Sequence, residues 1–258
     1  MRALVTGGAG FIASHLVEEL IADGWEVVIV DDLSTGKAEI LNGKAEFHRM
    51  DLRDNGLKDI FKDKIDVVFH LAAQAQVRFS LENPVYDASV NIGGAVNLME
   101  ACKGEVDKIV YASSGGAVYG EPEYIPVDEE HKVAPLSPYG VSKFIVEKYL
   151  RVYQDIYGLP YVALRYGNVY GPMQDPYGEA GVVAIFANKM LRGEVPTVNG
   201  DGEQTRDFVY VSDVVEANIL AAERNASGAI NIATGVQSSA NEIYEIIKKA
   251  PAASTAEA

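Results

Sequence analysis

The sequence has one cysteine, Cys102, and four scattered histidines among its 258 residues. A single cysteine excludes an internal disulfide framework, and no Cys/His cluster has the spacing of zinc ligands, so a bound metal is not expected. Basic residues are also scarce: 22 lysines and arginines stand against 37 aspartates and glutamates, which gives a net charge of −15. Because no basic cluster reverses this balance locally, the chain is not expected to bind nucleic acid.

Long apolar runs are missing as well. No stretch approaches the roughly 18 apolar residues that a membrane-spanning helix needs, so no association with a membrane is expected. The first residues lead directly into a glycine-rich turn instead of an apolar signal segment, which predicts a cytoplasmic protein. The length allows one large α/β domain with a smaller lobe attached, and it is too short for two full domains.

Short apolar runs rich in β-branched residues alternate with amphipathic stretches over the first two thirds of the chain. We predict these runs to be strands, at residues 3–5, 27–30, 67–69, 108–111 and 161–164. Near-continuous apolar strands are typical of a parallel sheet that is covered on both faces, and alternation with helices favours right-handed crossover connections. The predicted fold is therefore α/β, with a doubly wound parallel Rossmann-type sheet and a smaller C-terminal substrate lobe.

The amino-acid composition changes after residue 171, where a stretch rich in glycine, proline and aspartate begins. Beyond it the pattern predicts a helix at 182–192, turns at 199–205, a strand at 207–211, a helix at 213–224, a strand at 229–233 and a helix at 240–249. We expect residues 1–171 to form the nucleotide-binding domain. Residues 172–250 are expected to form mainly the substrate lobe, with elements that return to the sheet, and 251–258 a loose tail or truncated end.

The segment from Thr6 to Ala13, TGGAGFIA, follows a predicted strand and opens a predicted helix. Gly7 permits the sharp turn, Gly10 lets the backbone approach a pyrophosphate, and the helix directs free N–H groups at the phosphates. Ala13 replaces the third glycine of this fingerprint, where alanine is a known alternative. Such a turn can also serve only to pack a helix on a strand, but strand, turn and helix in this order favour a bound dinucleotide.

Asp31 stands at the end of the next predicted strand, about 20 residues further on. A carboxylate there accepts hydrogen bonds from a ribose diol and repels a 2′-phosphate, which favours NAD over NADP. Asp51 and Leu52, between the predicted strands 27–30 and 67–69, are placed to reach the adenine. Asp51 fits the role of a helix cap equally well.

Tyr139 and Lys143 lie four residues apart at the start of a predicted helix, with Pro138 in its first turn, so both side chains share one face. A lysine ammonium and the positive nicotinamide ring would favour the phenolate and lower a tyrosine pKa that is normally about 10. Tyr139 is then a candidate general base near neutral pH. The spacing also occurs by chance on helix surfaces, but its position downstream of a nucleotide turn favours the functional interpretation.

Seven motifs together resemble the extended short-chain dehydrogenase/reductase family, and within it most closely the UDP-glucose 4-epimerase group. The motifs are TGGAGFI from Thr6, VDDLS from Val30, HLAA from His70, SSGGAVYG from Ser113, YGVSK from Tyr139, LRYGNVYGP from Leu164 and RDFVYV from Arg206. The resemblance covers about residues 1 to 250. It implies an isomerase that uses tightly bound NAD to invert C4 of a UDP-hexose through a transient 4-keto sugar.

The resemblance also implies a role for individual residues. Tyr139 takes the proton of the sugar 4-hydroxyl, Lys143 binds the nicotinamide ribose, and Arg206 binds the nucleotide diphosphate, which a guanidinium suits. The implied NAD contacts come from Gly7, Gly10, Phe11, Ile12, Asp31, Asp32, Ser34, Thr35, Gly36, Asp51, Leu52, Leu71, Ala72, Ala73, Asn91, Ser113, Tyr139, Lys143 and Tyr166. The implied UDP-sugar contacts come from Ser114, Tyr139, Asn168, Val198 and Arg206.

Two features depart from the family pattern. Relatives place a serine or threonine, whose hydroxyl bonds the sugar oxygen, at the position of Gly115, so Ser114 or a water is the candidate replacement. Relatives also continue past the last helix of this chain, with a further arginine and an aromatic residue that close over the substrate. These departures affect the sugar pocket more than the NAD site.

Other functions remain open at this point. A nucleotide-sugar 4,6-dehydratase needs an acidic pair that Gly115-Gly116-Ala117 does not supply. A 4-reductase or oxidase differs only in how the intermediate is retained, and a non-catalytic dinucleotide-sensing module would have no use for both Tyr139 and Lys143.

The resemblance further implies a homodimer, in which two helices of each subunit form a four-helix bundle. The corresponding predicted helices are 85–103 and 138–156. The candidate interface residues are Val96, Leu98, Met99, Val146, Tyr149 and Leu150. The same residues fit core positions that face the sheet.

Overall fold

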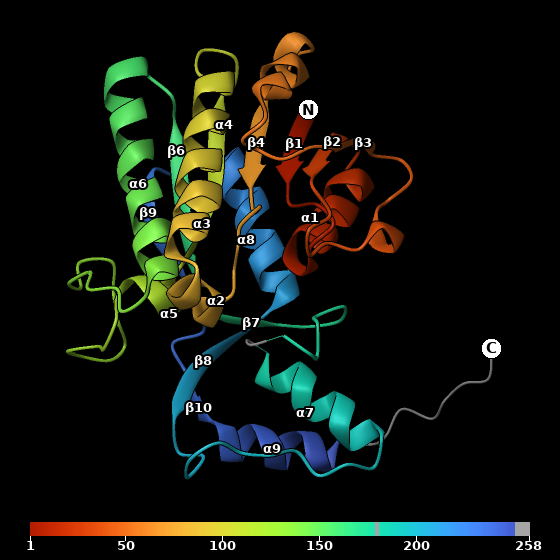
Figure 1. Cartoon of the computed structure of the whole chain (residues 1–258), viewed down its shortest axis with the longest axis vertical. Helices are drawn as coiled ribbons and strands as arrows, with labels where there is room; N and C mark the ends of the chain where they lie inside the picture. The colour runs from red at the N-terminus through yellow and green to blue at the C-terminus, as the bar shows by residue number, and fades with distance from the viewer. Residues whose placement is uncertain (179–180, 251–258) are drawn as a thin grey trace.

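The structure is a computed structural model that describes residues 1–178 and 181–250. Within these residues, seven parallel strands form the central sheet in the order β3-β2-β1-β4-β5-β6-β9 (Figure 1). The strands are β1 Arg2–Thr6, β2 Glu26–Asp31, β3 Glu46–Arg49, β4 Val67–His70, β5 Lys108–Ser114, β6 Tyr161–Tyr166 and β9 Gly228–Ile232. The five strands predicted before residue 171 are confirmed. The order reverses between β1 and β4, the position where doubly wound sheets bind ligands.

Helices cover both faces of this sheet. The main ones are α1 Phe11–Ala22, α4 Gly94–Cys102, α6 Pro138–Tyr157 and α8 Val211–Glu223. The shorter segments are η1 Ala38–Ile40, η2 Asn55–Lys62, α2 Val77–Glu82, α3 Pro84–Ala88 and α5 Gly115–Val118. This arrangement confirms the predicted doubly wound Rossmann-type fold.

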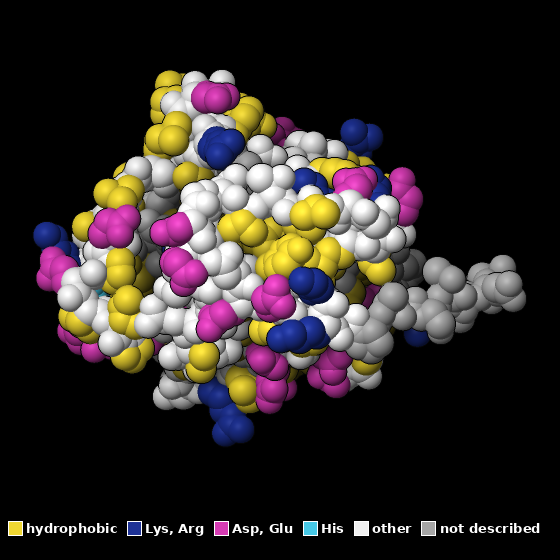
Figure 2. Space-filling view, turned by 90° about the horizontal axis from the view of Figure 1, so that it is seen from below, with side chains coloured by type: hydrophobic (Ala, Val, Ile, Leu, Met, Phe, Trp, Pro, Cys, Tyr) yellow, Lys and Arg dark blue, Asp and Glu magenta, His cyan; other side chains and the backbone are white. Residues whose placement is uncertain are grey.

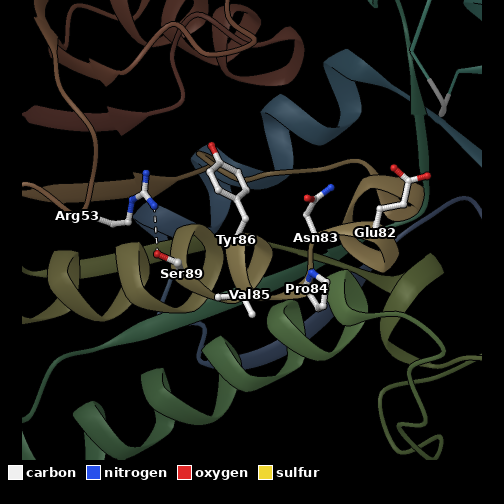
Figure 3. A pocket seen from close by; sticks show the side chains of 7 residues that line it. All are labelled: Arg53, Glu82, Asn83, Pro84, Val85, Tyr86 and Ser89. Carbon is white, nitrogen blue, oxygen red and sulfur yellow. Dashed lines mark hydrogen bonds between the residues drawn. The ribbon is translucent and has the colours of Figure 1, made fainter.

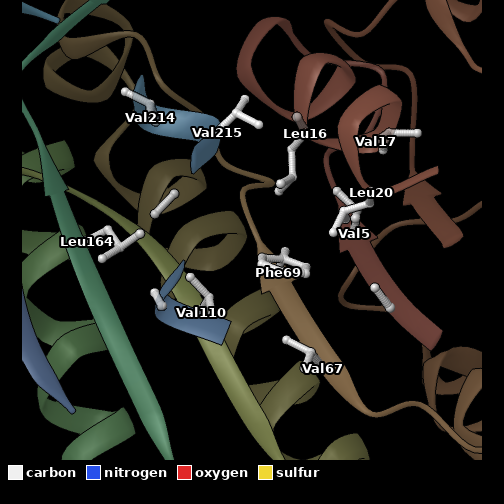
Figure 4. Packing of buried hydrophobic residues seen from close by; sticks show 14 of the residues in the cluster. Val5, Leu16, Val17, Leu20, Val67, Phe69, Val110, Leu164, Val214 and Val215 are labelled. Atoms are coloured by element: carbon white, nitrogen blue, oxygen red, sulfur yellow. The ribbon is translucent and has the colours of Figure 1, made fainter. Parts of the chain in front are cut away.

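Two hydrophobic cores separate the sheet from its helices, because successive side chains on a strand point to opposite faces. Val5, Phe69 and Val110 pack with α1 and α8 (Figure 4). Their neighbours Leu4 and Val68 pack with α4 and α6 on the other face. Every one of these five strand residues is fully buried, as expected for a parallel sheet with two covered faces.

The predicted helix 85–103 is wrong as a continuous α-helix. It consists of α3, a π-helical turn η3 Ser89–Gly93, and α4. The wider turn contains Asn91, which is buried and bonds both backbone groups of Gln74 in the loop after β4. Periodicity alone does not reveal such a π-turn, because the apolar pattern on either side continues.

The C-terminal lobe lies below the sheet in Figure 1. It contains a three-stranded sheet in the order β10-β8-β7. Its elements are β7 Asn168–Tyr170, α7 Val182–Leu191, β8 Thr205–Tyr210, β10 Gln237–Ser239 and α9 Ala240–Lys249. The sequence predicted neither β7 nor β10, since three residues are too few to show an alternating pattern.

The chain leaves this lobe twice to rejoin the large sheet: α8 packs in the same core as α1, and β9 pairs with β6. Seen from below, acidic and basic side chains are spread over the face of the lobe around an apolar cluster (Figure 2).

Helix α6 is the longest helix described and is well defined at both ends. Ser137 caps its start by accepting a hydrogen bond from the N–H of Gly140, Pro138 occupies the first turn, and Gly158 ends it in the left-handed conformation. These local signals fix the length of the helix.

A buried ion pair fixes where α6 lies on the sheet. The Arg165 guanidinium on β6 donates two hydrogen bonds to Glu147, with Nη2 to Oε2 at 2.6 Å and Nε to Oε1 at 3.0 Å, and both side chains are about 5% exposed. Ser113 on β5 donates to the same carboxylate, and Arg165 also donates to the hydroxyl of Tyr119, which donates to Asn231 on β9. The network thus joins α6 to β5, β6 and β9.

None of the helices in the described part of the chain is both long and apolar enough to cross a membrane. The predicted tail, 251–258, lies outside the described residues.

Candidate active and cofactor-binding site

The glycine turn between β1 and α1 is tightly packed at Gly7 and Gly8. Gly7 has φ +75°, and a Cβ there would lie 2.7 Å from the backbone nitrogen of Ala72. A Cβ on Gly8 would lie 2.5 Å from Ile29 on β2. Packing between β2 and the loop after β4 therefore requires both glycines, with or without a ligand.

Gly10 is different. Its φ of −94° suits any residue, and among the described residues a Cβ there would meet only the carbonyl oxygen of Gly7, at 3.1 Å. Gly10 begins α1 without a side-chain cap, so the first N–H groups of the helix, at Phe11 and Ile12, are available to an external acceptor. The turn therefore fits the pyrophosphate of NAD, which needs free N–H groups and a close approach to the backbone.

Asp31 organises the next part of the site. One carboxylate oxygen accepts from the N–H of Ala9 in the glycine turn at 3.0 Å, and the other from the N–H of Leu33 at 2.8 Å. Burial raises the pKa of this carboxyl, although the two backbone hydrogen bonds oppose the shift. A Cβ on Gly36 would lie 2.7 Å from Ala9 and 3.0 Å from Asp31, so the loop 32–36 folds back onto the turn.

The other predicted cofactor residues of this loop have mostly local contacts. Asp32 accepts a hydrogen bond from the N–H of Ser34, and Thr35 lies between Ser34 and Gly36. The structure therefore brings residues 31–36 and the glycine turn together as one surface.

Asp51 is engaged locally. Its carboxylate accepts from the backbone N–H of Arg53 and from the Arg53 guanidinium, which holds the pKa of Asp51 below its usual range. The helix-cap alternative for Asp51 is wrong, because Asp54 stands at the N-cap of the following helix η2. The predicted contact of Asp51 with adenine stays a prediction. Leu52 is nearly buried beside Gly94 of α4.

Arg53 points onward into a surface pocket of about 520 Å³ on the outer side of α3. The guanidinium donates to Ser89 and lies over the ring of Tyr86 (Figure 3). The lining of this pocket contains neither Tyr139 nor Lys143 nor the glycine turn, so it is separate from the predicted site.

The loop after β4 completes the floor of the site. Thr6 and His70 share a hydrogen bond of 2.8 Å where the strand order reverses, and the Thr6 hydroxyl also accepts from the N–H of Ala72. Burial lowers the pKa of His70 to about 3, so this histidine is neutral at physiological pH. Leu71, Ala72 and Ala73 follow directly, beside Gly7.

Tyr139 and Lys143 lie together at the start of α6. Lys143 is 4% exposed, donates from Nζ to the carbonyl of Ala112 at 2.8 Å, and has Nζ 5.8 Å from the ring centre of Tyr139. Its Nζ also lies 5.0 Å from the ring centre of Tyr111. The structure therefore brings the predicted pair together with the end of β5.

The predicted lowering of the Tyr139 pKa is wrong for the protein without a bound dinucleotide. Tyr139 as a whole is only partly buried, but the dense surroundings of its phenol raise its pKa to about 12, while a hydrogen bond with Ser114 opposes the shift. Burial lowers the pKa of Lys143 to about 8, and Asp87 and Glu147 oppose this shift. The Lys143 ammonium is turned toward the carbonyl of Ala112. Desolvation of the Tyr139 phenol therefore raises its pKa more than attraction to this ammonium lowers it.

Two of the predicted cofactor residues direct their side chains into the protein. The hydroxyl of Ser113 donates to Glu147, and the hydroxyl of Tyr166 forms a buried hydrogen-bond pair with Asn218. The hydroxyl groups of both residues are therefore engaged within the protein. Asn91 is likewise bonded to Gln74 and Asp87.

The predicted substrate residues lie at the border with the lobe. The side chain of Asn168 at the start of β7 lies near Gly116, 3.7 Å from the position of a Cβ there. Arg206 on β8 is exposed and donates to the carbonyl of Thr205, and Val198 is half-buried in the loop before β8. A Cβ on Gly115 would lie 3.3 Å from the carbonyl oxygen of Tyr166, so glycine suits the close approach of α5 to β6.

Sequence reasoning missed the polar residues that surround the pair. Ser80 accepts a hydrogen bond from the N–H of Tyr139, and Asp87 bonds Ser142, Gln74 and Asn91. The spacing of four between Asp87 and Asn91 was a usable signal, because it places the two polar residues on one face of the predicted helix.

A Rossmann sheet with an uncapped glycine turn at its first crossover, and a Tyr-x-x-x-Lys helix beside the same edge, defines a dehydrogenase-like class of nicotinamide-dependent proteins. The chain belongs to the NAD dependent epimerase/dehydratase family, whose model matches residues 3–233.

Close relatives agree with this assignment. A putative UDP-glucose 4-epimerase of Methanocaldococcus jannaschii is 54% identical over 248 residues, covering 95% of this chain and 81% of the relative. The crystal structure of the Thermotoga maritima UDP-glucose 4-epimerase with UDP-glucose superposes with a TM-score of 0.94 at 48% identity, covering 96% of this chain and 82% of the other. The Thermus thermophilus UDP-glucose 4-epimerase in complex with NAD gives 0.90 at 49%, with the same coverage.

The contrast between Gly7 and Gly10 predicts two different effects of alanine. Gly10→Ala is expected to leave the thermal midpoint within a few degrees of wild type but to lower the NAD content of the purified protein, because the added methyl occupies the space for the phosphate. Gly7→Ala is expected to lower the midpoint itself, since both its φ and its contact with Ala72 are unfavourable. Equal melting and equal NAD content in the two variants would contradict this division.

Lys143 is expected to cost stability. The unfolded chain keeps this proton up to about pH 10.5, whereas the folded protein releases it near pH 8, so stability should rise with pH between these values. Lys143→Met is therefore expected to be more stable than wild type near neutral pH, with the difference vanishing above pH 10.5. Urea denaturation across this range measures it. The matched control is Lys148→Met, which removes an exposed lysine from the same helix.

Proposed function

We propose that this protein interconverts UDP-galactose and UDP-glucose by inverting C4 of the hexose with tightly bound NAD, through a transient 4-keto sugar. The observation that carries the proposal is the placement of Tyr139, Lys143 and Ser114 at the edge of the sheet that also holds the glycine turn. The similarity to epimerases whose structures hold UDP-glucose or NAD supports the choice of substrate and cofactor.

Tyr139, Ser114 and Lys143 have separate roles in this reaction. Tyr139 accepts the proton of the sugar 4-hydroxyl and later returns it, and Ser114 bonds the same phenol and orients it. Lys143 leaves the carbonyl of Ala112 to hold the nicotinamide ribose, and its ammonium then lowers the Tyr139 pKa from its high resting value. Bound NAD supplies the oxidising and then the reducing equivalent at C4.

The substrate residues belong to the same proposal. We place the nucleotide diphosphate against Asn168, Val198 and Arg206, at the border between the sheet and residues 172–250, which serve mainly as the substrate lobe. The exposed guanidinium of Arg206 is suited to a phosphate. The cytoplasmic location stays a prediction from the sequence.

The structure favours an epimerase over a 4,6-dehydratase. A dehydratase needs a carboxylate beside the sugar, and the end of β5 continues into Gly115, Gly116 and Ala117. A reductase or oxidase shares the Tyr139–Lys143 pair, so the fate of the cofactor separates these functions.

The purified protein is expected to convert UDP-galactose to UDP-glucose without net formation of NADH. Tyr139→Phe should lower kcat by about 10²–10⁴-fold, because it removes the general base. Bound NAD should be retained, since the lost hydroxyl contributes little to cofactor binding. Arg206→Ala should mainly raise KM for the UDP-sugar, by about tenfold. Accumulating NADH would indicate an oxidase, loss of the C6 oxygen a dehydratase, and full activity of Tyr139→Phe would refute the mechanism.

We also propose that the protein is a homodimer, through a surface that shares only Tyr149 with the residues that the sequence predicted. Leu98, Met99, Val146 and Leu150 are buried against the sheet, and Val96 packs on the same core. Exposed apolar side chains follow one stripe of α6 instead, at Val141, Tyr149, Val152 and Ile156. Val85 on the neighbouring α3 is 83% exposed and extends this surface.

Sedimentation of the wild-type protein is expected to give twice the chain mass of 27.8 kDa. Val152→Glu, in the middle of the stripe, should give monomers, because it places a charge in an apolar interface. Leu191→Glu, on the exposed side of α7, is the control that should stay dimeric. A monomeric wild type would exclude this interface.

A further inference from the structure

Asp87 is a completely buried carboxylate that the proposed mechanism does not use. It lies on α3 and is 0% exposed. Its Oδ2 accepts a hydrogen bond from the hydroxyl of Ser142 at 2.6 Å, and its Oδ1 accepts from the amides of Gln74 at 2.9 Å and Asn91 at 3.0 Å. Both oxygens act as acceptors, which is the bonding pattern of an ionised carboxylate.

The three donors come from three separate segments around the site. Ser142 lies on α6 between Tyr139 and Lys143, Gln74 lies in the loop after β4, and Asn91 lies in the π-helical turn η3. Gln74 and Asn91 also bond each other through backbone and side chain in both directions. Asp87 therefore connects the helix of the catalytic pair with the loop that borders the glycine turn.

The charge of Asp87 is not neutralised by its partners. The donors are a hydroxyl and two amides, and the ion pairs among the described residues do not include Asp87. An ionised group in such surroundings acts strongly on its neighbours, because little water screens it.

The other groups that face the Tyr139–Lys143 pair contribute less charge. Glu147, on the same helix, is paired with Arg165. His70 on β4 is neutral, and Tyr111 on β5 is a buried phenol whose pKa is raised well above its usual value. Asp87 raises the pKa of both Tyr139 and Lys143, as a nearby negative charge does.

We propose that Asp87 is a positioning residue of the active site: it clamps α6 to the loop after β4 through Ser142 and Gln74, and it holds a buried negative charge against the helical turn that carries Tyr139 and Lys143. This inference rests on the roles proposed above for Tyr139 and Lys143. The same charge disfavours the phenolate of Tyr139. Asp87 therefore supports Lys143, the residue proposed to hold the nicotinamide ribose, but makes Tyr139 a weaker acid.

Asp87→Asn is the direct test, because it keeps the shape and removes the charge. The amide oxygen still accepts from Gln74 and Asn91, and the amide nitrogen donates to Ser142. The titration of Lys143 is followed by NMR of carbon-13-labelled lysine in the protein without NAD, with the signal assigned from Lys143→Met. The Lys143 pKa, about 8 in wild type, is expected to fall by about one unit.

Activity gives a second readout. Without the buried charge Tyr139 ionises more easily, so the acid limb of the kcat profile is expected to move to lower pH in Asp87→Asn. A purely structural role would lower kcat at every pH and leave both titrations in place. An unchanged Lys143 pKa in a folded Asp87→Asn would overturn the proposal.

Ser142→Ala is the matched variant that keeps the charge and breaks the clamp. Its Lys143 pKa is expected to stay within about 0.3 unit of wild type or to rise, while kcat falls by about tenfold or more. If Asp87→Asn fails to fold, this variant decides: wild-type kcat in Ser142→Ala would refute the clamp. The lysine titration needs no turnover, so the two proposals can fail separately. If the wild-type protein were inactive but Asp87→Asn lowered the Lys143 pKa as expected, the epimerase function would be refuted and the role of Asp87 would stand.

Discussion

The buried ion pair between Glu147 and Arg165 is the interaction on which the active site depends. Burying two charges is costly, and the cost is offset only when the geometry is good and the remaining bonds are made. Here the contact is bidentate, and Ser113 and Tyr119 supply the additional partners. Glu147 lies one helical turn after Lys143, so the pair that holds α6 on the sheet also sets the position of the chemistry.

The cofactor side of the site depends on the absence of side chains from the glycine turn. Two glycines of the turn are required by the protein's own packing, whereas the third leaves a space that no described side chain fills. Among the described residues, a Cβ on Gly10 would meet only the carbonyl oxygen of Gly7, at 3.1 Å, so the space outside the turn is open to a ligand. The reversal of strand order beside β1 then places this space next to the carboxyl ends of β4 and β5.

Sequence patterns predicted what is repeated and local. The strands were predicted from short apolar runs, and the glycine turn from the order of strand, turn and helix. The proximity of Tyr139 and Lys143 followed from their helical spacing alone. The patterns failed where long-range contacts decide: the π-turn at Asn91 serves a bond to a distant loop, and the three-residue strands β7 and β10 exist only because β8 lies between them. Except for Tyr149, the apolar residues assigned to a dimer face pack in the core, since periodicity does not say which of two apolar stripes meets the sheet. The resting pKa of Tyr139 also depends on surroundings that no single motif contains.

Asp31 shows how a structural bond and a choice between cofactors can reside in one group. The charge that pins the loop 32–36 to the glycine turn is also the charge that the sequence predicts to repel a 2′-phosphate. Because burial raises the pKa of this carboxyl, the charge is lost at less extreme acidity than for an aspartate in water. The attachment of the loop 32–36 to the glycine turn is therefore a titratable property of the protein, stronger in neutral solution than in acid.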